Sequence, residues 1–208
     1  MEYAFHLHNK LAADGICMSI DRLLRIKNTL KNRKTKGTGT QLNQPPADAP
    51  QAPPVVVCIG SDLAIGDSLG PIVGSMLKYK TQGLGAFIYG TLASPVTAKE
   101  ITHLRAFLRE THFNEQILAI DAAVGEKGDI GLIKIQDTPL FPGAGANKKL
   151  GEIGDVSLMG IVAEKSLTNY ALLNTTRLNL VYSLSDIISD AVSNLLWERC
   201  SSFAKQNA

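Results

Sequence analysis

Residues 55–71 read VVVCIGSDLAIGDSLGP, and this stretch decides the fold class. It begins with a run of apolar, mostly β-branched residues, which is typical of a buried strand. It continues into a glycine-rich loop that ends at Gly70-Pro71, and proline is well tolerated in the first turn of a helix. The stretch therefore predicts a strand, a loop that carries Asp67, and a helix over residues 69–79.

Strands and helices alternate along the rest of the chain. Apolar runs predict further strands over residues 86–90, 117–121, 131–136 and 158–163. An apolar stripe predicts a long closing helix over residues 178–203. A capping-box pattern at Thr97–Glu100 opens another helix. Alternating elements favour parallel pairing with helices on both faces. We therefore expect a three-layer α/β/α domain with a mostly parallel sheet over residues 55–204.

Residues 1–54 differ in composition from the rest of the chain. Residues 1–36 hold eight Lys/Arg and three acids, whereas the remainder holds 13 basic and 16 acidic residues. A short helix is conceivable over residues 18–31, but residues 35–54 are rich in Thr, Gly, Gln, Pro and Ala. That composition buries too little apolar surface to order itself. We expect a basic N-terminal tail and a flexible linker, without a strong nucleic-acid signal because aromatic residues are not interleaved with the charges.

The chain shows no signal for secretion, membrane insertion or a disulfide framework. Its three cysteines are scattered, without a CxxC motif or a Cys/His cluster. No apolar run reaches the roughly 18 residues that a membrane span needs, and the N-terminus has no long apolar stretch. We therefore expect a cytoplasmic protein with no membrane partner.

Two aspartates directly follow predicted strands. Asp67 lies in the loop after the first strand, and Asp121 ends the apolar run 117–120. Ligands of open α/β sheets bind outside the carboxyl ends of the parallel strands. Two carboxylates at that edge can share a proton and activate a water, which is hydrolase chemistry. Asp67 has a structural alternative as a helix cap, whereas an acid at the end of an apolar strand needs a partner or a function.

The glycine-rich segments do not fit nucleotide-binding motifs. The glycines of residues 60–70 are not spaced as GxGxxG, and residues 142–149 lack the second glycine and the Ser/Thr of a P-loop. The histidines lie in the N-terminal segment or on the predicted helix before strand 117–121, far from the carboxyl ends of the strands. The sequence therefore predicts neither a cofactor nor a metal site.

Three segments together resemble the germination protease of spore-forming bacteria. They are the loop Gly66–Pro71, the strand end Ile120-Asp121-Ala122, and Asp137-Thr138 followed by the run Pro142–Lys148. Over roughly residues 55–195 the chain is similar to the short YyaC-type sporulation proteins and, more distantly, to hydrogenase maturation proteases. The resemblance implies a phosphorylase/hydrolase-like fold and a location in the forespore or spore core.

The same resemblance implies an aspartic-type endopeptidase whose catalytic pair is Asp67 and Asp121. Asp67, near a helix N-terminus, would be the ionised base, and Asp121, buried at a strand end, the protonated partner. Backbone N–H groups of Gly143 and Gly145, with Asn147 and Lys148, would bind the substrate. Donors aimed at a developing oxyanion commonly contribute about 3 kcal/mol.

The implied partner is a protein substrate, in the germination protease a small DNA-coating spore protein. Two alternatives stay open. One is a non-catalytic sporulation protein that binds a peptide or partner in the same cleft. The other is a metal-dependent maturation peptidase, although the histidine of the nickel-binding relatives has no counterpart here. A homo-oligomer is also left open.

Overall fold

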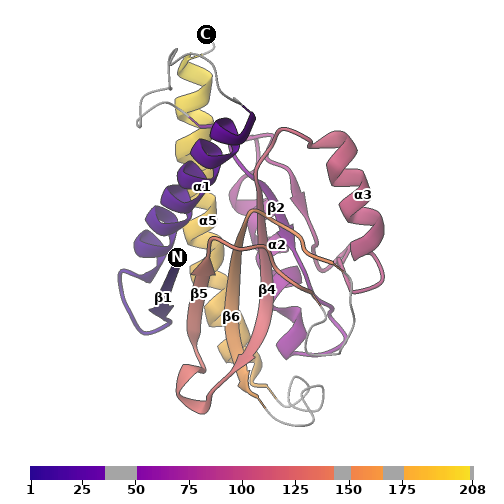
Figure 1. Cartoon of the computed structure of the whole chain (residues 1–208). Coiled ribbons are helices and arrows are strands. Elements are labelled where there is room, and N and C mark those ends of the chain that lie inside the picture. Colours follow the sequence, from indigo (N-terminus) through magenta and orange to yellow (C-terminus); the bar gives the residue numbers. More distant parts are fainter. Residues whose placement is uncertain (36–50, 143–150, 166–175, 207–208) are drawn as a thin grey trace.

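A computed structural model describes residues 1–35, 51–142, 151–165 and 176–206 (Figure 1). One six-stranded sheet has the order β1-β5-β6-β4-β2-β3. Its strands are β1 (Glu2–His6), β2 (Val55–Cys58), β3 (Ile88–Tyr89), β4 (Ile117–Gly125), β5 (Leu132–Gln136) and β6 (Val156–Glu164). The strands β6, β4, β2 and β3 are parallel, whereas β5 and β1 are each antiparallel to their inner neighbour. The predicted mostly parallel α/β fold is confirmed.

Helices cover both faces of the sheet. They are α1 (Ala12–Thr35), α2 (Leu69–Lys80), α3 (Ile101–Thr111) and α5 (Leu178–Gln206), with short 3-10 turns η1 (Gly66–Ser68) and η2 (Lys127–Asp129). The larger core cluster joins α1, α2 and α5 to one face, and the smaller cluster joins α3 to the other. Figure 1 shows α3 apart from the other three helices. None of the described helices has both the length and the apolar character that crossing a membrane requires.

The helix predicted to follow Thr97–Glu100 is present as α3, but its N-cap residue is Glu100, which forms no side-chain capping bond. The N–H of Thr97 donates to Glu100 Oε2 at 3.0 Å, and the N–H of Lys99 donates to Thr97 Oγ1 at 3.3 Å. These bonds hold the turn just before the helix, which begins at Ile101. The capping-box pattern therefore located this helix correctly from local chemistry alone.

The first 35 residues differ from the basic tail that we expected. Strand β1 pairs with β5 from Glu2–Gln136 to His6–Leu132. Helix α1 fully buries the stripe Ile16, Ile20, Leu23 and Leu24. This stripe has helical spacing, and part of the helix was expected, over residues 18–31. Strand β1 was not expected, because its partner lies far away in the sequence. The segment is thus part of the folded domain, whereas residues 36–50 of the expected linker lie outside the described residues.

A buried ion pair fastens α1 to α5. Arg199 is only 3% exposed. Its Nε donates to Asp21 Oδ1 at 2.9 Å, and its Nη1 donates to the carbonyl oxygen of Ala52 at 3.1 Å. The other oxygen of Asp21 accepts a bond from Arg25 Nε at 2.7 Å. Arg199 therefore ties both helices to the segment that leads into β2.

We expect Arg199→Met to lower the free energy of unfolding by about 3 kcal/mol, because it leaves a partly buried carboxylate without its main partner. The expected loss is at the lower end of the usual range for a broken buried ion pair, because Arg25 still compensates the charge of Asp21. Urea unfolding measures the loss. Lys78→Met, at an exposed position of α2, is the matched control and should change stability by less than about 0.5 kcal/mol.

The same pair makes stability depend on pH. Burial works to raise the pKa of Asp21, but the hydrogen bonds and charges of Arg25 and Arg199 hold the pKa below its ordinary value. A lowered pKa in the folded state adds stability above the unfolded pKa of about 3.9, and this stability is lost as pH falls through the folded pKa. The destabilisation by Arg199→Met should therefore shrink in acid. An unchanged difference at all pH values would contradict this account.

Candidate active site

Close backbone packing holds the loop that carries Asp67 against the end of β2. A Cβ on Gly60, which has φ +141°, would lie 2.1 Å from the carbonyl oxygen of Asp67. A Cβ on Gly70 would lie 2.0 Å from the carbonyl oxygen of Ile59. The N–H of Ser61 donates to the same Asp67 carbonyl at 3.1 Å. These glycines allow contact between backbones, a structural role that agrees with their failure to match a nucleotide motif.

Asp67 lies in η1, between β2 and α2, and is not the cap of α2. The residue before α2 is Ser68, which forms no side-chain capping bond; its hydroxyl donates to the carbonyl of Ile65 at 2.6 Å. Burial raises the pKa of Asp67, and a hydrogen bond from the backbone of Ser61 only partly offsets this. We had expected the helix N-terminus to favour the charged form, but burial outweighs that effect.

Asp121 lies inside β4 rather than at its end. The strand continues to Gly125, and Asp121 pairs with Met159 of β6. On its other side β2 has already ended, since its last pair is Cys58 with Ile120. Side chains alternate along a strand, so Asp121 points to the same face as Ala119, which belongs to the α3 side of the core. The half-buried carboxyl of Asp121 therefore lies beside the point where β2 ends and the loop that carries Asp67 begins.

The two acids influence each other. Burial raises the pKa of Asp121 well above its ordinary value, and the negative charge of Asp67 raises it further. A bond from the N–H of Ala122 to Asp121 Oδ1, at 2.8 Å, acts in the opposite direction. The elements η1 and β4 are in direct contact. Two acids within electrostatic reach of each other titrate as a unit, and the surroundings favour the protonated form of both, most strongly that of Asp121.

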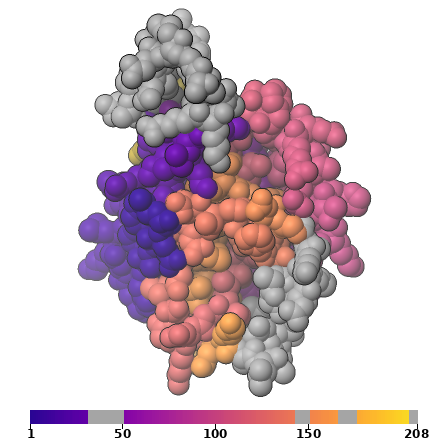
Figure 2. Space-filling model, in the orientation of Figure 1, coloured from indigo at the N-terminus to yellow at the C-terminus, as the bar shows by residue number. Residues whose placement is uncertain are grey.

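The other predicted site residues cannot be placed. Gly143, Gly145, Asn147 and Lys148 lie outside the described residues. Figure 2 shows orange segments of the described chain between the indigo N-terminal elements and the pink α3. Leu140 and Ile153 exchange backbone hydrogen bonds of 2.9 Å across these segments. The roles of the four residues therefore stay predictions.

The described residues do not form a metal site around the acids. Within residues 1–35, 51–142, 151–165 and 176–206, no three His, Cys, Asp or Glu side chains are grouped so that they could hold a metal ion. Asp67 and Asp121 offer two carboxylates, whereas catalytic zinc sites commonly use three protein ligands. Two neighbouring carboxylates are the composition of a proton-sharing acid pair.

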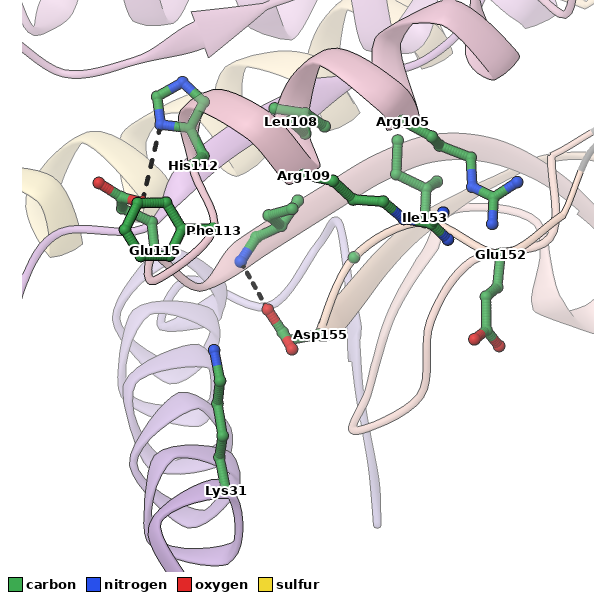
Figure 3. Close-up of a pocket in the computed structure, with 12 residues that line it drawn as sticks. Lys31, Arg105, Leu108, Arg109, His112, Phe113, Glu115, Glu152, Ile153 and Asp155 are labelled. Carbon is green, nitrogen blue, oxygen red and sulfur yellow. Dashed lines mark hydrogen bonds and ion pairs between the residues drawn. The ribbon is translucent and has the colours of Figure 1, made fainter. Parts of the chain in front are cut away.

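Sequence reasoning missed a concave feature away from the two acids. His112 directly follows helix α3, is 5% exposed and lines a pocket at the amino ends of β4 and β6 (Figure 3). We had set this histidine aside because it lies far from the carboxyl ends of the strands. The pocket is assembled from segments distant in sequence, so no local pattern marks it.

Comparisons with known proteins place the chain in a family. A family model described as "Protein of unknown function (DUF1256)" matches residues 27–191. The chain is 37% identical over 180 residues to "Uncharacterized protein YyaC" of Bacillus subtilis (strain 168), covering 86% of this chain and 87% of that protein. The similarity to YyaC-type proteins predicted from the sequence is thereby confirmed.

A solved structure shares part of the architecture. The [NiFe] hydrogenase maturation protease HycI from Thermococcus kodakarensis KOD1 matches with a TM-score of 0.45 and 17% sequence identity. The match covers 70% of this chain and 93% of that chain. At this level of similarity it carries no argument about activity, which has to come from the residues themselves.

Proposed function

The chain belongs to the family described as "Protein of unknown function (DUF1256)", and we propose that it is an endopeptidase that hydrolyses peptide bonds with Asp67 and Asp121. One observation carries the proposal: burial raises the pKa of Asp121, and the negative charge of Asp67 raises it further. Strongly perturbed acids that lie within electrostatic reach of one another are typical of catalytic acid–base pairs. Neither acid serves as a helix cap, and none of the described bases forms a salt bridge with either.

The proposed reaction divides the work between the two acids. Ionised Asp67 takes a proton from a water, whose oxygen forms a bond to the carbonyl carbon of the substrate. Neutral Asp121 donates a hydrogen bond to the carbonyl oxygen as negative charge develops there. Asp67 then passes its proton to the leaving amide nitrogen, and the C–N bond breaks. The products are a carboxylic acid and an amine, and the pair returns to its starting state.

The biological setting forms part of the same proposal. The similarity to YyaC-type sporulation proteins supports a protein substrate, and the forespore or spore core as the location. The loop with Gly143, Gly145, Asn147 and Lys148 would bind the substrate main chain. The acid pair itself would accept any peptide bond presented to it, so selectivity would reside in the surrounding loops.

Cleavage of a small spore protein by purified wild type and by Asp67→Asn tests the proposal. We expect the variant to lose about 10²–10⁴-fold in rate, because it has no base for the water. Asp62→Asn is the matched control, since Asp62 is an exposed acid of the same loop and should leave the rate unchanged. Circular dichroism checks that both variants fold.

Other outcomes would replace the proposal. Full activity of folded Asp67→Asn would exclude the acid pair. Binding of the spore protein by the wild type, without cleavage at any pH between about 4 and 8, would favour the non-catalytic binding protein. Loss of cleavage with a chelator, and its recovery on adding nickel, would favour the metal-dependent peptidase.

A further inference from the structure

A concave site lies at the other end of the sheet from the two acids. Its volume is about 320 Å³, within the range of small-molecule sites. Ile117 is the first residue of β4, and Asp155 directly precedes β6, so the pocket sits at the amino ends of these strands. Leu108, Ile117 and Ile153 supply its apolar wall. The pocket is therefore separate from Asp67 and Asp121.

Charges of both signs surround this apolar wall. The cations are Lys31, Arg105 and Arg109, and the carboxylates are Glu115, Glu152 and Asp155. Figure 3 shows Arg105 and Arg109 toward one end and His112 with Glu115 toward the other. A purely anionic ligand would meet the three carboxylates, and a purely cationic ligand would meet the three cations. A ligand with separate positive and negative ends matches both.

His112 presents a polar atom that lacks a partner. Its ring packs edge-on against Phe87 with centroids 4.6 Å apart, and its Nε2 lies 2.8 Å from the hydroxyl of Tyr89. These contacts fix the ring, and its Nδ1 is buried without a hydrogen bond to any described residue. Burying such an atom unpaired is costly. A hydrogen-bond partner that the described residues do not supply is needed here.

Glu115 shows what that group would be. Its Oε2 lies 4.0 Å from His112 Nδ1, too far for a direct hydrogen bond. Figure 3 shows the two groups facing each other at this end of the pocket. We assign the ring proton to Nε2, which then donates a hydrogen bond to the Tyr89 hydroxyl and leaves Nδ1 as an acceptor. Nδ1 and the Glu115 carboxylate are then two acceptors that one ammonium group, with its three N–H donors, can bridge.

We propose that this pocket binds a small zwitterion, namely a dipeptide or amino acid with apolar side chains. Its ammonium group donates to His112 Nδ1 and Glu115, and its carboxylate lies by Arg105 and Arg109. Its side chains contact Leu108, Ile117 and Ile153. The proposal does not depend on peptidase activity, because no residue of the pocket belongs to the acid pair.

Isothermal titration calorimetry with leucyl-leucine as the probe tests this site. We expect saturable binding to the full chain with a Kd of about 1 mM or tighter. N-acetyl-leucyl-leucine and leucyl-leucine amide, each with one charge blocked, should bind at least about tenfold more weakly, because each lacks one end of the match. Binding that is absent, or equal for blocked and free peptides, would overturn the proposal and leave a bridging water as the partner of Nδ1.

Variants locate the binding. Glu115→Gln and Arg109→Gln should each weaken leucyl-leucine binding by about tenfold or more. Both residues lie at least partly on the surface, so the fold should persist. Asp67→Asn, at the other end of the sheet, and Glu126→Gln, at an exposed turn, should bind as the wild type does. Binding that survives both pocket variants, or disappears in Asp67→Asn alone, would overturn the proposal.

A spectroscopic readout follows the histidine itself. In ¹⁵N spectra of the wild type, leucyl-leucine should shift the Nδ1 resonance of His112, because this atom gains a donor. The resonances of His6 and His8, which lie at the opposite edge of the sheet in and next to β1, serve as internal controls. A titration that leaves His112 unmoved would also overturn the proposal.

Discussion

Asp121→Asn is expected to abolish peptide cleavage and, at neutral pH, to make the folded protein more stable. The loss follows from the proposed role: an amide cannot act as the acid that shares its proton with Asp67, and such roles are worth about 10²–10⁴ in rate. The gain follows from burial, since an amide has no charged form to desolvate. The amide oxygen can still accept the 2.8 Å bond from the N–H of Ala122.

The stability difference should depend on pH in one direction. Burial and the charge of Asp67 raise the pKa of Asp121. A group whose pKa is raised in the folded state contributes to the stability of the folded protein. This contribution is complete below the unfolded pKa of about 3.9 and is lost as pH rises through the folded pKa. The advantage of Asp121→Asn over the wild type should therefore be small near pH 4 and larger near about pH 8.

Urea unfolding at both pH values, together with cleavage rates, measures the two effects on one protein. Asp62→Asn again serves as the control and should change neither quantity, because its carboxylate is exposed. If Asp121→Asn were less stable than the wild type at the higher pH, the carboxyl would be held as a stabilised anion. The assignment of Asp121 as the neutral partner would then be wrong.

The pH dependence of the cleavage rate should also reflect the ionisation of the two acids. Activity requires Asp67 ionised and Asp121 protonated, so it should fall in acid as Asp67 gains a proton and fall again at higher pH as Asp121 loses one. Burial raises the pKa of Asp67, so the acid limb should lie above the range of an ordinary aspartate. The two limbs belong to the pair rather than to either residue.

The fold could be predicted where the signal is local. The run 55–71 and the stripe of α5 each contain their own strand, loop or helix chemistry, and the structure has them as predicted. Strand β1 could not be predicted in this way, because its hydrogen bonds come from β5, more than a hundred residues later. The extension of β4 to Gly125 likewise depends on pairing with β6.

The candidate site shows the same division. The positions of Asp67 and Asp121 just after apolar runs marked them in the sequence, because strand ends gather at one edge of a sheet. The direction of the pKa of Asp67 was not predictable, since burial depends on the whole surroundings of η1. The pocket of His112 was not predictable at all, because α1, α3, β4 and the segment before β6 each supply only part of it.

Gly74→Ala is expected to destabilise the folded protein strongly, although alanine favours a helix over glycine by about 1 kcal/mol. Gly74 lies within α2, and its added Cβ would stand 1.8 Å from the carbonyl oxygen of Gly90. Gly90 cannot move away, because its Cα packs against the backbone of Cys58. A Cβ added at Gly90 would lie 1.8 Å from the carbonyl oxygen of Cys58.

Overpacking against fixed backbone costs about 3 kcal/mol or more, so the clash outweighs the gain in helix propensity, and α2 must move off β2. The loop of Asp67 would move with it, and cleavage should fall together with the free energy of unfolding. Gly128→Ala is the matched control, since nothing lies within 4 Å of its added Cβ, and it should unfold at the urea concentration of the wild type. A Gly74→Ala variant as stable as this control would show that α2 does not rest on Gly90, and the loop of Asp67 would then need another anchor.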